Sequence, residues 1–338
     1  MSDRERGVLS DVVTAFGLGE LSTVEPVTTG TMNRNWRVST PAGVYAVKQL
    51  LDVGADQARR HHVATSALAA KGFPVPCPAA LADGDTLLEH PAGLFAVSAW
   101  AAGVHRAGGE LDLAQCEAVG RVLGDVHVLL ASVLPATPPL VPADTKDPGA
   151  VCEAIDRYVA LIDGRRSRGE GDDFDDRARG LLLTRRASIE TQVCRRPDDA
   201  ARVGPAGWIH GDFQQYNVLW DGGRVSAVLD WDRLRVGVLP SEVVRAAVYL
   251  FSHADGHGVD LDRVAAFVRG YRAVEPVGAV AFADAVHRWW WNQLCALWQL
   301  SRHYELGDLR CDRFFFSESA LLSWWEHHAD DVRDAFAS

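Results

Sequence analysis

The chain has 338 residues, of which 48% are hydrophobic and 23% are charged. This composition is ordinary for a globular enzyme, and it excludes a largely disordered chain, a collagen-like repeat and a coiled coil. The 34 Lys and Arg residues against 45 Asp and Glu residues give a net charge of −11. An acidic surface repels phosphate backbones, so we expect no nucleic-acid partner.

The sequence contains no feature that predicts a membrane or a secreted protein. No apolar run reaches the roughly 18 residues of a membrane span, and the N-terminal segment lacks the apolar core of a signal peptide. The six cysteines form no C-x-x-C pair, so neither a zinc site nor a disulfide framework is indicated. We therefore expect a cytoplasmic protein with reduced thiols and no membrane partner.

The first hundred residues are predicted to form a small, mostly antiparallel sheet with one main helix. Alternation of polar and apolar residues predicts strands at 35–40 and 44–50, joined by a Pro-Ala-Gly turn. The Ala-rich segment 55–71 is predicted to be a helix, because Gly72 and Pro74 follow it as stop signals. Shorter strands are expected at 79–82, 86–89 and 94–99.

Beyond Gly103 the pattern becomes helical. Apolar residues at three- and four-residue steps predict a helix over 113–131, and a proline-rich loop follows. Two short strands are expected near 208–230, and the other predicted helices lie at 151–162, at 178–194 and from about 230 to the C-terminus. The chain should therefore divide at a connector near 98–103 into a small β-rich N-terminal lobe, 1–100, and a helical C-terminal lobe, 101–338. Clefts between such lobes are favoured ligand sites.

The most informative stretch is a predicted hairpin around the turn D-G-G-R at 221–224. Pairing centred on this turn places Asn217 and Asp230 about two residues, roughly 7 Å, apart on neighbouring strands. An amide oxygen and a carboxylate at that separation can reach one cation of the Mg²⁺ type. Asp212, on the loop that enters the hairpin, brings a second carboxylate to the same end.

These residue types suit phosphoryl transfer. The leaving diphosphate needs a metal ion and a positive side chain, and the accepting hydroxyl needs a carboxylate that orients it and takes its proton. Lys48, near the end of strand 44–50, is the candidate for the positive side chain. The small polar loop 28–35 can bring backbone N–H groups close to phosphates. Neither a Walker-type nor a Rossmann glycine motif is present.

The motif H-G-D-x-x-x-x-N at 210–217, followed by a hairpin and by L-D-W-D at 229–232, resembles the aminoglycoside phosphotransferase and choline kinase superfamily. The similarity extends to N-W-R-V at 35–38, Y-A-V-K at 45–48, K-G-F-P-V-P at 71–76 and G-x-x-L-G-x-x-H at 120–127. The resemblance implies an α+β chain with the bilobal protein-kinase-like fold, a small antiparallel-sheet N-lobe and a larger, mostly helical C-lobe. It also implies a kinase that uses ATP or GTP with Mg²⁺, in which 1–100 is the nucleotide-binding lobe, 98–103 is the hinge, and 101–338 carries the catalytic loop and the acceptor site.

The resemblance further implies roles for individual residues. Asp212 would be the catalytic base, Asn217 and Asp230 the Mg²⁺ ligands, and His210 a structural member of the catalytic loop. Lys48 would contact the α- and β-phosphates. The remaining nucleotide contacts would come from the phosphate-covering loop and from the hinge whose backbone meets the purine: Thr29, Gly30, Thr31, Asn33, Ser98, Ala99 and Trp100.

The sequence departs from this family at the helix that usually carries a Glu paired with the lysine. The aligned position is His61 or His62, and no Glu occurs in 55–71. Either Asp56 or a glutamate from another element, such as Glu89, must replace it, or Lys48 is held differently.

The acceptor site is predicted from fewer residues. Asp232 and Glu242 are candidates to bind a cationic acceptor, and Trp298 is a candidate platform for a cyclic one. The stripe that Trp298 shares with Trp290 and Leu294 on one helical face is otherwise typical of a core. We expect an antibiotic-resistance kinase with an aminoglycoside-like or other amine-bearing, cyclic acceptor. The alternatives are a metabolic kinase of the homoserine, choline or sugar type, and a non-catalytic nucleotide-binding module.

Overall fold

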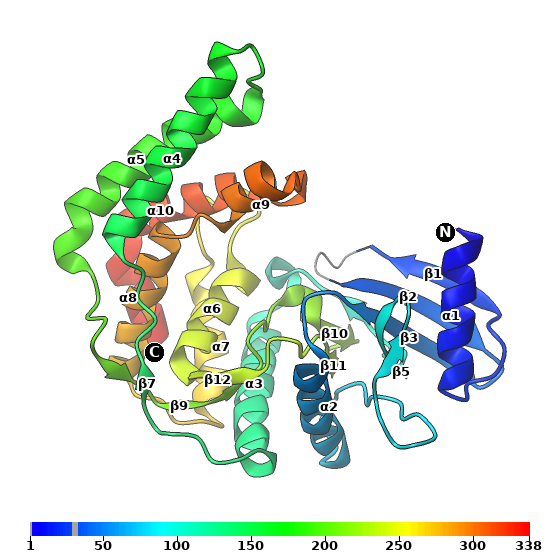
Figure 1. Cartoon of the computed structure of the whole chain (residues 1–338). Helices are drawn as coiled ribbons and strands as arrows, with labels where there is room; N and C mark the ends of the chain where they lie inside the picture. The colour runs from blue at the N-terminus through cyan, green and yellow to red at the C-terminus, as the bar shows by residue number, and fades with distance from the viewer. Residues whose placement is uncertain (1, 29–32) are drawn as a thin grey trace. The chain divides into compact units, whose positions relative to one another are not determined.

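The computed structural model describes residues 2–28 and 33–338, with a five-stranded antiparallel sheet near the N-terminus and a mostly helical remainder (Figure 1). The predicted α+β class is confirmed. The chain forms two compact units. The first comprises the chain up to Glu110 with Val122–Thr137 and Trp208–Val236, and the second comprises Leu111–Arg121, Pro138–Gly207 and Gly237–Ser338. The predicted lobe boundary near residue 100 and the hinge at 98–103 stay predictions.

The sheet of the first unit has the strand order β1-β2-β3-β5-β4, and every neighbouring pair is antiparallel. Its strands are β1 (Thr23–Val27), β2 (Arg34–Thr40), β3 (Gly43–Leu50), β4 (Leu88–His90) and β5 (Gly93–Ala99). The predicted strand at 79–82 is wrong: only an isolated bridge joins Pro78 to Ser98. The Leu81 N–H donates to the Asp85 carbonyl at 2.7 Å and the Gly84 N–H donates to the Leu81 carbonyl at 2.9 Å, so the chain turns here instead of continuing along the sheet.

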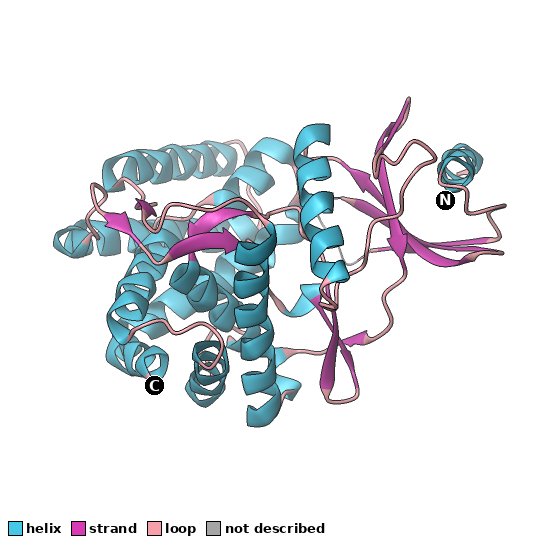
Figure 2. Cartoon of the chain, turned by 90° about the horizontal axis from the view of Figure 1, so that it is seen from below, coloured by secondary structure: helices cyan, strands magenta, loops and turns pink. Residues whose placement is uncertain are grey.

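Two helices cover opposite faces of this sheet (Figures 1 and 2). The N-terminal helix α1 (Asp3–Ala15), which the sequence analysis missed, is capped by Ser2 and packs its apolar side on Val47 and its neighbours. Helix α2 (Ala55–Ala70) packs on the other face, which includes Leu50. Because side chains alternate along β3, Lys48 points to the same face as Leu50 and therefore towards α2.

A second sheet in this unit carries the predicted hairpin, with the strand order β11-β10-β6. Its strands are β6 (Val104–His105), β10 (Val218–Asp221) and β11 (Arg224–Val228). The predicted register is correct at the turn, where Asp221 faces Arg224. A bulge between Leu219 and Trp220 then shifts it by one, so that Val218 faces Val228. A bulge inserts one residue in one strand, and sequence pairing from a turn cannot anticipate it.

The second unit is built mainly from helices. Helix α4 begins after the cap Asp147 with Pro148 in its first turn, and α5 begins with a capping box of Asp172 and Asp175. The helices of the chain beyond the first sheet are α3 (Leu113–Val133), α4 (Pro148–Ser167), α5 (Asp173–Gln192), α6 (Leu239–Phe251), α7 (Leu261–Arg272), α8 (Ala279–Leu294), α9 (Trp298–Leu306) and α10 (Asp312–Ala337). Two short strand pairs complete the fold: β7 (Val141–Pro142) with β8 (Arg202–Val203), and β9 (Ala206–Ile209) with β12 (Arg235–Val238).

The predicted tryptophan stripe does not run along one helix. Helix α8 ends at Leu294 and α9 begins at Trp298, so the helix is interrupted between them. Trp290 and Leu294 are buried, whereas Trp298 is 42% exposed. In the part of the chain that the structure describes, no helix has the length and apolar character needed to span a bilayer.

Candidate active site

The loop that follows β9 is braced by His210, which is fully buried. The Asp212 N–H donates to Nδ1 of His210 at 3.2 Å, so the ring proton is on Nε2, which donates to the Leu229 carbonyl at 2.9 Å. Gly211 between them has φ +84°, and a Cβ there would lie 2.2 Å from the Arg233 carbonyl oxygen. The histidine hydrogen bond holds this loop against the segment that follows β11, and the absence of a Cβ at Gly211 permits the close approach.

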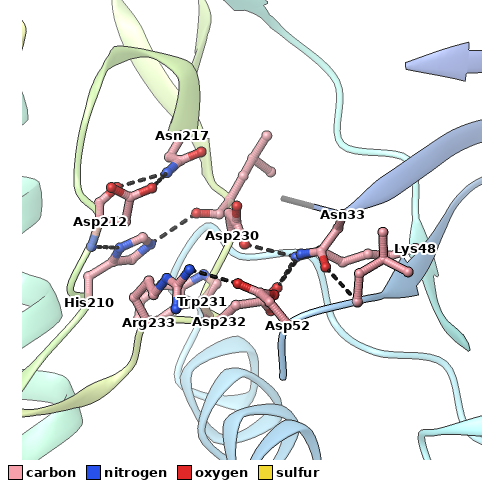
Figure 3. Close-up of polar contacts among 12 residues, drawn as sticks. Asn33, Lys48, Asp52, His210, Asp212, Asn217, Asp230, Trp231, Asp232 and Arg233 are labelled. Carbon is pink, nitrogen blue, oxygen red and sulfur yellow. Dashed lines mark hydrogen bonds and ion pairs between the residues drawn. The ribbon is translucent and has the colours of Figure 1, made fainter. Parts of the chain in front are cut away.

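Asn217 holds the side chain and the backbone of Asp212. Its Nδ2 donates to the Asp212 carbonyl at 2.8 Å and to Asp212 Oδ2 at 3.0 Å (Figure 3). Gln214 Nε2 donates to the same carboxylate oxygen at 3.2 Å. Since the nitrogen of Asn217 is used in this way, its oxygen is the atom available to a ligand. Asp212 is thereby fixed, and the residue is half-buried.

Lys48 joins the hairpin to the five-stranded sheet through two carboxylates. Its Nζ lies 2.8 Å from Asp230 Oδ1 and 2.7 Å from Asp232 Oδ2 (Figure 3). Asp230 has a φ of +59°, a left-handed conformation that Asp tolerates better than most residues and that turns its side chain towards the lysine. The structure thus brings Lys48, Asp230 and Asp232 together from positions more than 180 residues apart.

The electrostatics of this group favour charge on both partners. Burial opposes the Lys48 ammonium, but Asp230 and Asp232 outweigh it and raise the lysine pKa. Burial likewise disfavours the Asp230 carboxylate, but the Lys48 ammonium lowers its pKa below the usual value. Both groups are therefore ionised at neutral pH.

The predicted phosphate-covering loop falls mostly outside the described residues, which exclude Thr29, Gly30 and Thr31. Asn33, at its end, is engaged by protein groups. Its Nδ2 donates to Asp232 Oδ2 at 2.7 Å, and its Oδ1 accepts from the Leu51 N–H at 3.0 Å.

The predicted substitutes for the missing helix glutamate do not reach Lys48. Both carboxylates lie beside the guanidinium of Arg59 on α2, Glu89 at 3.0 Å and Asp56 at 3.8 Å. His61 is buried, and this burial lowers its pKa. His62 contacts Thr86 at 2.8 Å, and burial lowers its pKa to about 4. Of the alternatives left open by the sequence, the third holds: Lys48 is paired differently.

The predicted hinge residues lie at the C-terminal end of β5. Ser98 and Ala99 pair with Ala46 and Tyr45, and the Trp100 N–H donates to the Val44 carbonyl at 3.0 Å. Ala96 faces Lys48 across the strands, so Ser98 is two residues, roughly 7 Å, along the strand from the lysine.

The three acceptor candidates have different surroundings. Asp232 belongs to the first unit and is occupied by Lys48 and Asn33. Glu242 and Trp298 belong to the second unit, where Glu242 is buried in α6 and Trp298 is exposed at the start of α9.

One ion pair beside the site was not predicted from the sequence. Arg233 Nη2 contacts Asp52 Oδ2 at 2.7 Å and ties the segment after β3 to the segment after β11. The two residues are 181 positions apart, and neither belongs to a motif that would have paired them in advance.

Asp230 and Asn217 supply oxygen ligands of the type that Mg²⁺ prefers. Asp230 is ionised, and the Asn217 nitrogen is engaged by Asp212, which leaves the Asn217 oxygen for a metal ion. Among residues 2–28 and 33–338, no group of three or more His, Cys, Asp or Glu side chains forms a preassembled metal cluster. Mg²⁺ is commonly held by one or two carboxylates together with substrate phosphates and water, so this donor set fits it.

Comparison with known proteins defines the class. The sequence profile of the Phosphotransferase enzyme family matches residues 23–277, and the chain belongs to that family. It is a phosphotransferase that acts on a hydroxyl acceptor. Homoserine kinase from Methylobacillus glycogenes is 26% identical over 273 residues, which cover 78% of this chain and 74% of that protein. A homoserine kinase from Methylobacillus flagellatus is also 26% identical, over 268 residues that cover the same shares.

Solved structures share the fold. The amicoumacin kinase hAmiN, in complex with AMP-PNP, Ca²⁺ and Ami, superposes with a TM-score of 0.63 at 15% identity, covering 98% of this chain and 94% of that one. Choline kinase from Cryptosporidium parvum Iowa II gives a TM-score of 0.54 at 10% identity and covers 98% of both chains. The predicted protein-kinase-like fold is therefore confirmed.

Proposed function

We propose that the chain is a Mg²⁺-dependent kinase that transfers the γ-phosphoryl group of ATP or GTP to a hydroxyl of an amine-bearing small molecule. The observation that carries this proposal is the assembly of one base, two oxygen ligands and one lysine within the first unit. Asn217 holds Asp212, and Lys48 contacts Asp230. A non-catalytic nucleotide-binding module would not need a carboxylate fixed by two amide side chains beside this group.

Each side chain has a defined task in this proposal. Asp212 accepts the proton of the acceptor hydroxyl, and its hydrogen bonds from Asn217 and Gln214 keep the carboxylate oriented for that transfer. Lys48 provides positive charge to the α- and β-phosphates. Asp230 and Asn217 would hold Mg²⁺, which when bound neutralises charge on the phosphates. Most of the acceleration comes from positioning and charge neutralisation, because phosphoryl transfer has a loose transition state.

The amine-bearing acceptor is supported by charge and by the relatives. The net charge of −11 favours cationic small molecules, and the aromatic second unit offers an exposed Trp298. Aminoglycosides, choline and homoserine share a hydroxyl and a cationic nitrogen. We take an antibiotic as the first candidate, since solved structures of this fold include the amicoumacin kinase and a spectinomycin phosphotransferase, APH(9)-Ia.

A metabolic acceptor is the second candidate. It is favoured by the two homoserine kinases, which at 26% identity are more similar in sequence to this chain than the amicoumacin kinase at 15%, the spectinomycin phosphotransferase at 12% and the choline kinase at 10%. Homoserine also carries an amine, so both candidates belong to the proposed chemical class.

Mass spectrometry of an acceptor panel tests the proposal. The protein is incubated with Mg²⁺ and either ATP or GTP, together with aminoglycosides, peptide antibiotics, homoserine, choline and sugars. We expect one amine-bearing compound to gain a phosphoryl group, and none to do so with Asp212→Asn. Modification of homoserine alone would select the second candidate. Modification of a neutral sugar alone, or of no compound with either nucleotide, would contradict the proposal.

A further inference from the structure

The two carboxylates that contact Lys48 are held in different ways. The Asp230 side chain is 41% exposed, whereas the Asp232 side chain is 17% exposed. Asp232 Oδ2, the oxygen that contacts the lysine, also accepts from Asn33 Nδ2 at 2.7 Å. Asn33 is itself fixed, because its Oδ1 accepts from the Leu51 N–H. Asp232 is thus the more strongly restrained of the two partners (Figure 3).

The helix that covers this face of the sheet supplies no carboxylate to Lys48. Position 61 on α2 is a buried histidine whose Nδ1 has no hydrogen-bond partner among the described residues. Asp56 is 92% exposed and, like Glu89, lies close to Arg59. Within the described part of the first unit, the anions that contact Lys48 therefore come from the segment after β11.

These two anions would not serve the lysine equally during turnover. In the proposed function Asp230 is a metal ligand, so its negative charge is shared with a divalent cation once the nucleotide is bound. Asp232 then remains as the carboxylate that keeps Lys48 extended across the sheet face. Its hydrogen bond from Asn33 would keep that contact in place if Asp230 were engaged by a metal ion.

We propose that Asp232, held by Asn33, is the positioning residue that orients Lys48 towards the phosphates, in place of the missing helix glutamate. This inference rests on the proposed function of Lys48 and Asp230. It also reassigns Asp232, which the sequence analysis treated as a candidate for binding the acceptor. The aspartate acts through the lysine and does not touch the substrate.

The direction in which Asp232→Asn changes nucleotide affinity distinguishes a positioning role from electrostatic repulsion of the phosphates. Asp232→Asn removes a negative charge close to where phosphates would bind, so simple Coulomb repulsion predicts tighter nucleotide binding. Positioning predicts the reverse. Loss of a charge-assisted hydrogen bond to Lys48 should weaken nucleotide affinity about tenfold.

The test is a double-mutant cycle in calorimetric titrations with AMP-PNP and Mg²⁺. The proteins are the parent, Asp232→Asn, Lys48→Met and the double variant. The matched control is Asp52→Asn, which removes a carboxylate of an adjacent ion pair of the same 2.7 Å length that does not involve Lys48. We expect Asp232→Asn to weaken binding in the parent and to have no further effect in the Lys48→Met background, while Asp52→Asn stays within about twofold of the parent.

Three results would overturn the positioning role. The first is unchanged or tighter AMP-PNP binding in Asp232→Asn. The second is that Asp232→Asn weakens AMP-PNP binding equally in the parent and in the Lys48→Met background. The third is an equal loss of AMP-PNP affinity in Asp232→Asn and in Asp232→Glu, although Asp232→Glu keeps the charge. Thermal unfolding of each variant, compared with the parent, establishes that it is folded. If Asp232→Asn does not fold, Asp232→Glu completes the cycle, with a smaller loss that again disappears in Lys48→Met.

The Mg²⁺ dependence of turnover distinguishes positioning from metal binding. Asp232→Asn should raise the KM for the nucleotide and leave the half-saturating Mg²⁺ concentration unchanged, whereas Asp230→Asn should raise the latter. An equal increase in Mg²⁺ requirement in both variants would make Asp232 a metal ligand and overturn the inference. A parent protein that binds no AMP-PNP would instead contradict the proposed function itself.

Discussion

Each unit contains a cluster of buried or partly buried ionisable groups. Burial disfavours charge in both, but ion pairs outweigh it in only one. In the lysine cluster of the first unit (Lys48, Asp230, Asp232 and Asn33), direct ion pairs outweigh burial, raising the pKa of Lys48 and lowering that of Asp230, so that these two groups stay charged. In the glutamate cluster of the second unit (Glu318, Gln299 and Arg185), burial raises the pKa of Glu318 to about 7 despite the Gln299 hydrogen bond and the Arg185 charge.

The difference follows from the contacts. Lys48 meets its carboxylates within 3 Å, at a partly exposed site. Glu318 accepts from a neutral amide, and the Arg185 guanidinium is directed to the Ala296 carbonyl and the Ser319 hydroxyl. Burial lowers the Arg185 pKa to about 10, although the nearby Glu318 charge opposes this shift. The ion-paired Lys48 and Asp230 stay charged and can exchange partners with a charged ligand. The Glu318 carboxyl, whose pKa is raised by burial, contributes to packing instead.

The largest expected effect is the loss of turnover in Asp212→Asn. Removal of a positioned base should slow phosphoryl transfer by about 10²–10⁴-fold, with folding and nucleotide binding retained. Steady-state kinetics and calorimetry measure both quantities. Asp221→Asn, an exposed carboxylate in the same hairpin, is the matched control and should turn over like the parent. Parental turnover in Asp212→Asn would show that another group takes the proton.

Removal of the cation from the lysine cluster should have the next largest effect. Lys48→Met should lower kcat/KM for the nucleotide about a hundredfold, because a preorganised positive donor to the phosphates is lost. Lys71→Met, an exposed lysine at the end of α2, provides the control. If the two variants had the same kcat/KM, Lys48 would not contact the nucleotide.

The glutamate cluster should affect stability rather than catalysis. The folded pKa of Glu318 lies above its usual value, so its contribution is favourable below about pH 4.5 and is lost as the pH rises to about 7. Glu318→Gln, which can still accept from Gln299, should unfold like the parent near pH 5 and be about 2 kcal/mol more stable near pH 8. Urea unfolding at both pH values measures this, with the exposed Glu326→Gln on the same helix as control. A pH-independent difference would refute the assignment.

The smallest expected effect concerns acceptor binding. Trp298→Ala should raise the KM for the acceptor a few-fold without changing the KM for the nucleotide, since an exposed ring adds only about 1 kcal/mol of contact to a cation. Leu306→Ala, at the exposed end of the same helix, is the comparison. An unchanged acceptor KM would remove Trp298 from the acceptor site.

Local patterns allowed the sequence to predict the elements that carry the motifs. Alternation in β2 and β3 and the turn at 221–224 were sufficient to place Lys48 on the sheet and Asn217 and Asp230 at one end of a hairpin. The edge strand β1, which contains Pro26, has too weak a pattern for that.

Contacts between distant segments were beyond such reasoning. The partners of Lys48 depend on how the segment after β11 meets β3, and the Asn33–Asp232 hydrogen bond joins residues 199 positions apart. The break between α8 and α9, which exposes Trp298, likewise could not be predicted, because no Gly or Pro lies between the two helices.

Calorimetric titration of AMP-PNP at increasing Mg²⁺ concentrations tests the central claim most directly. With the parent protein, nucleotide affinity should rise with Mg²⁺, and Asp230→Asn should largely abolish that dependence while metal-free binding is retained. The same Mg²⁺ dependence in Asp230→Asn and in the parent would contradict a divalent ion held at this hairpin.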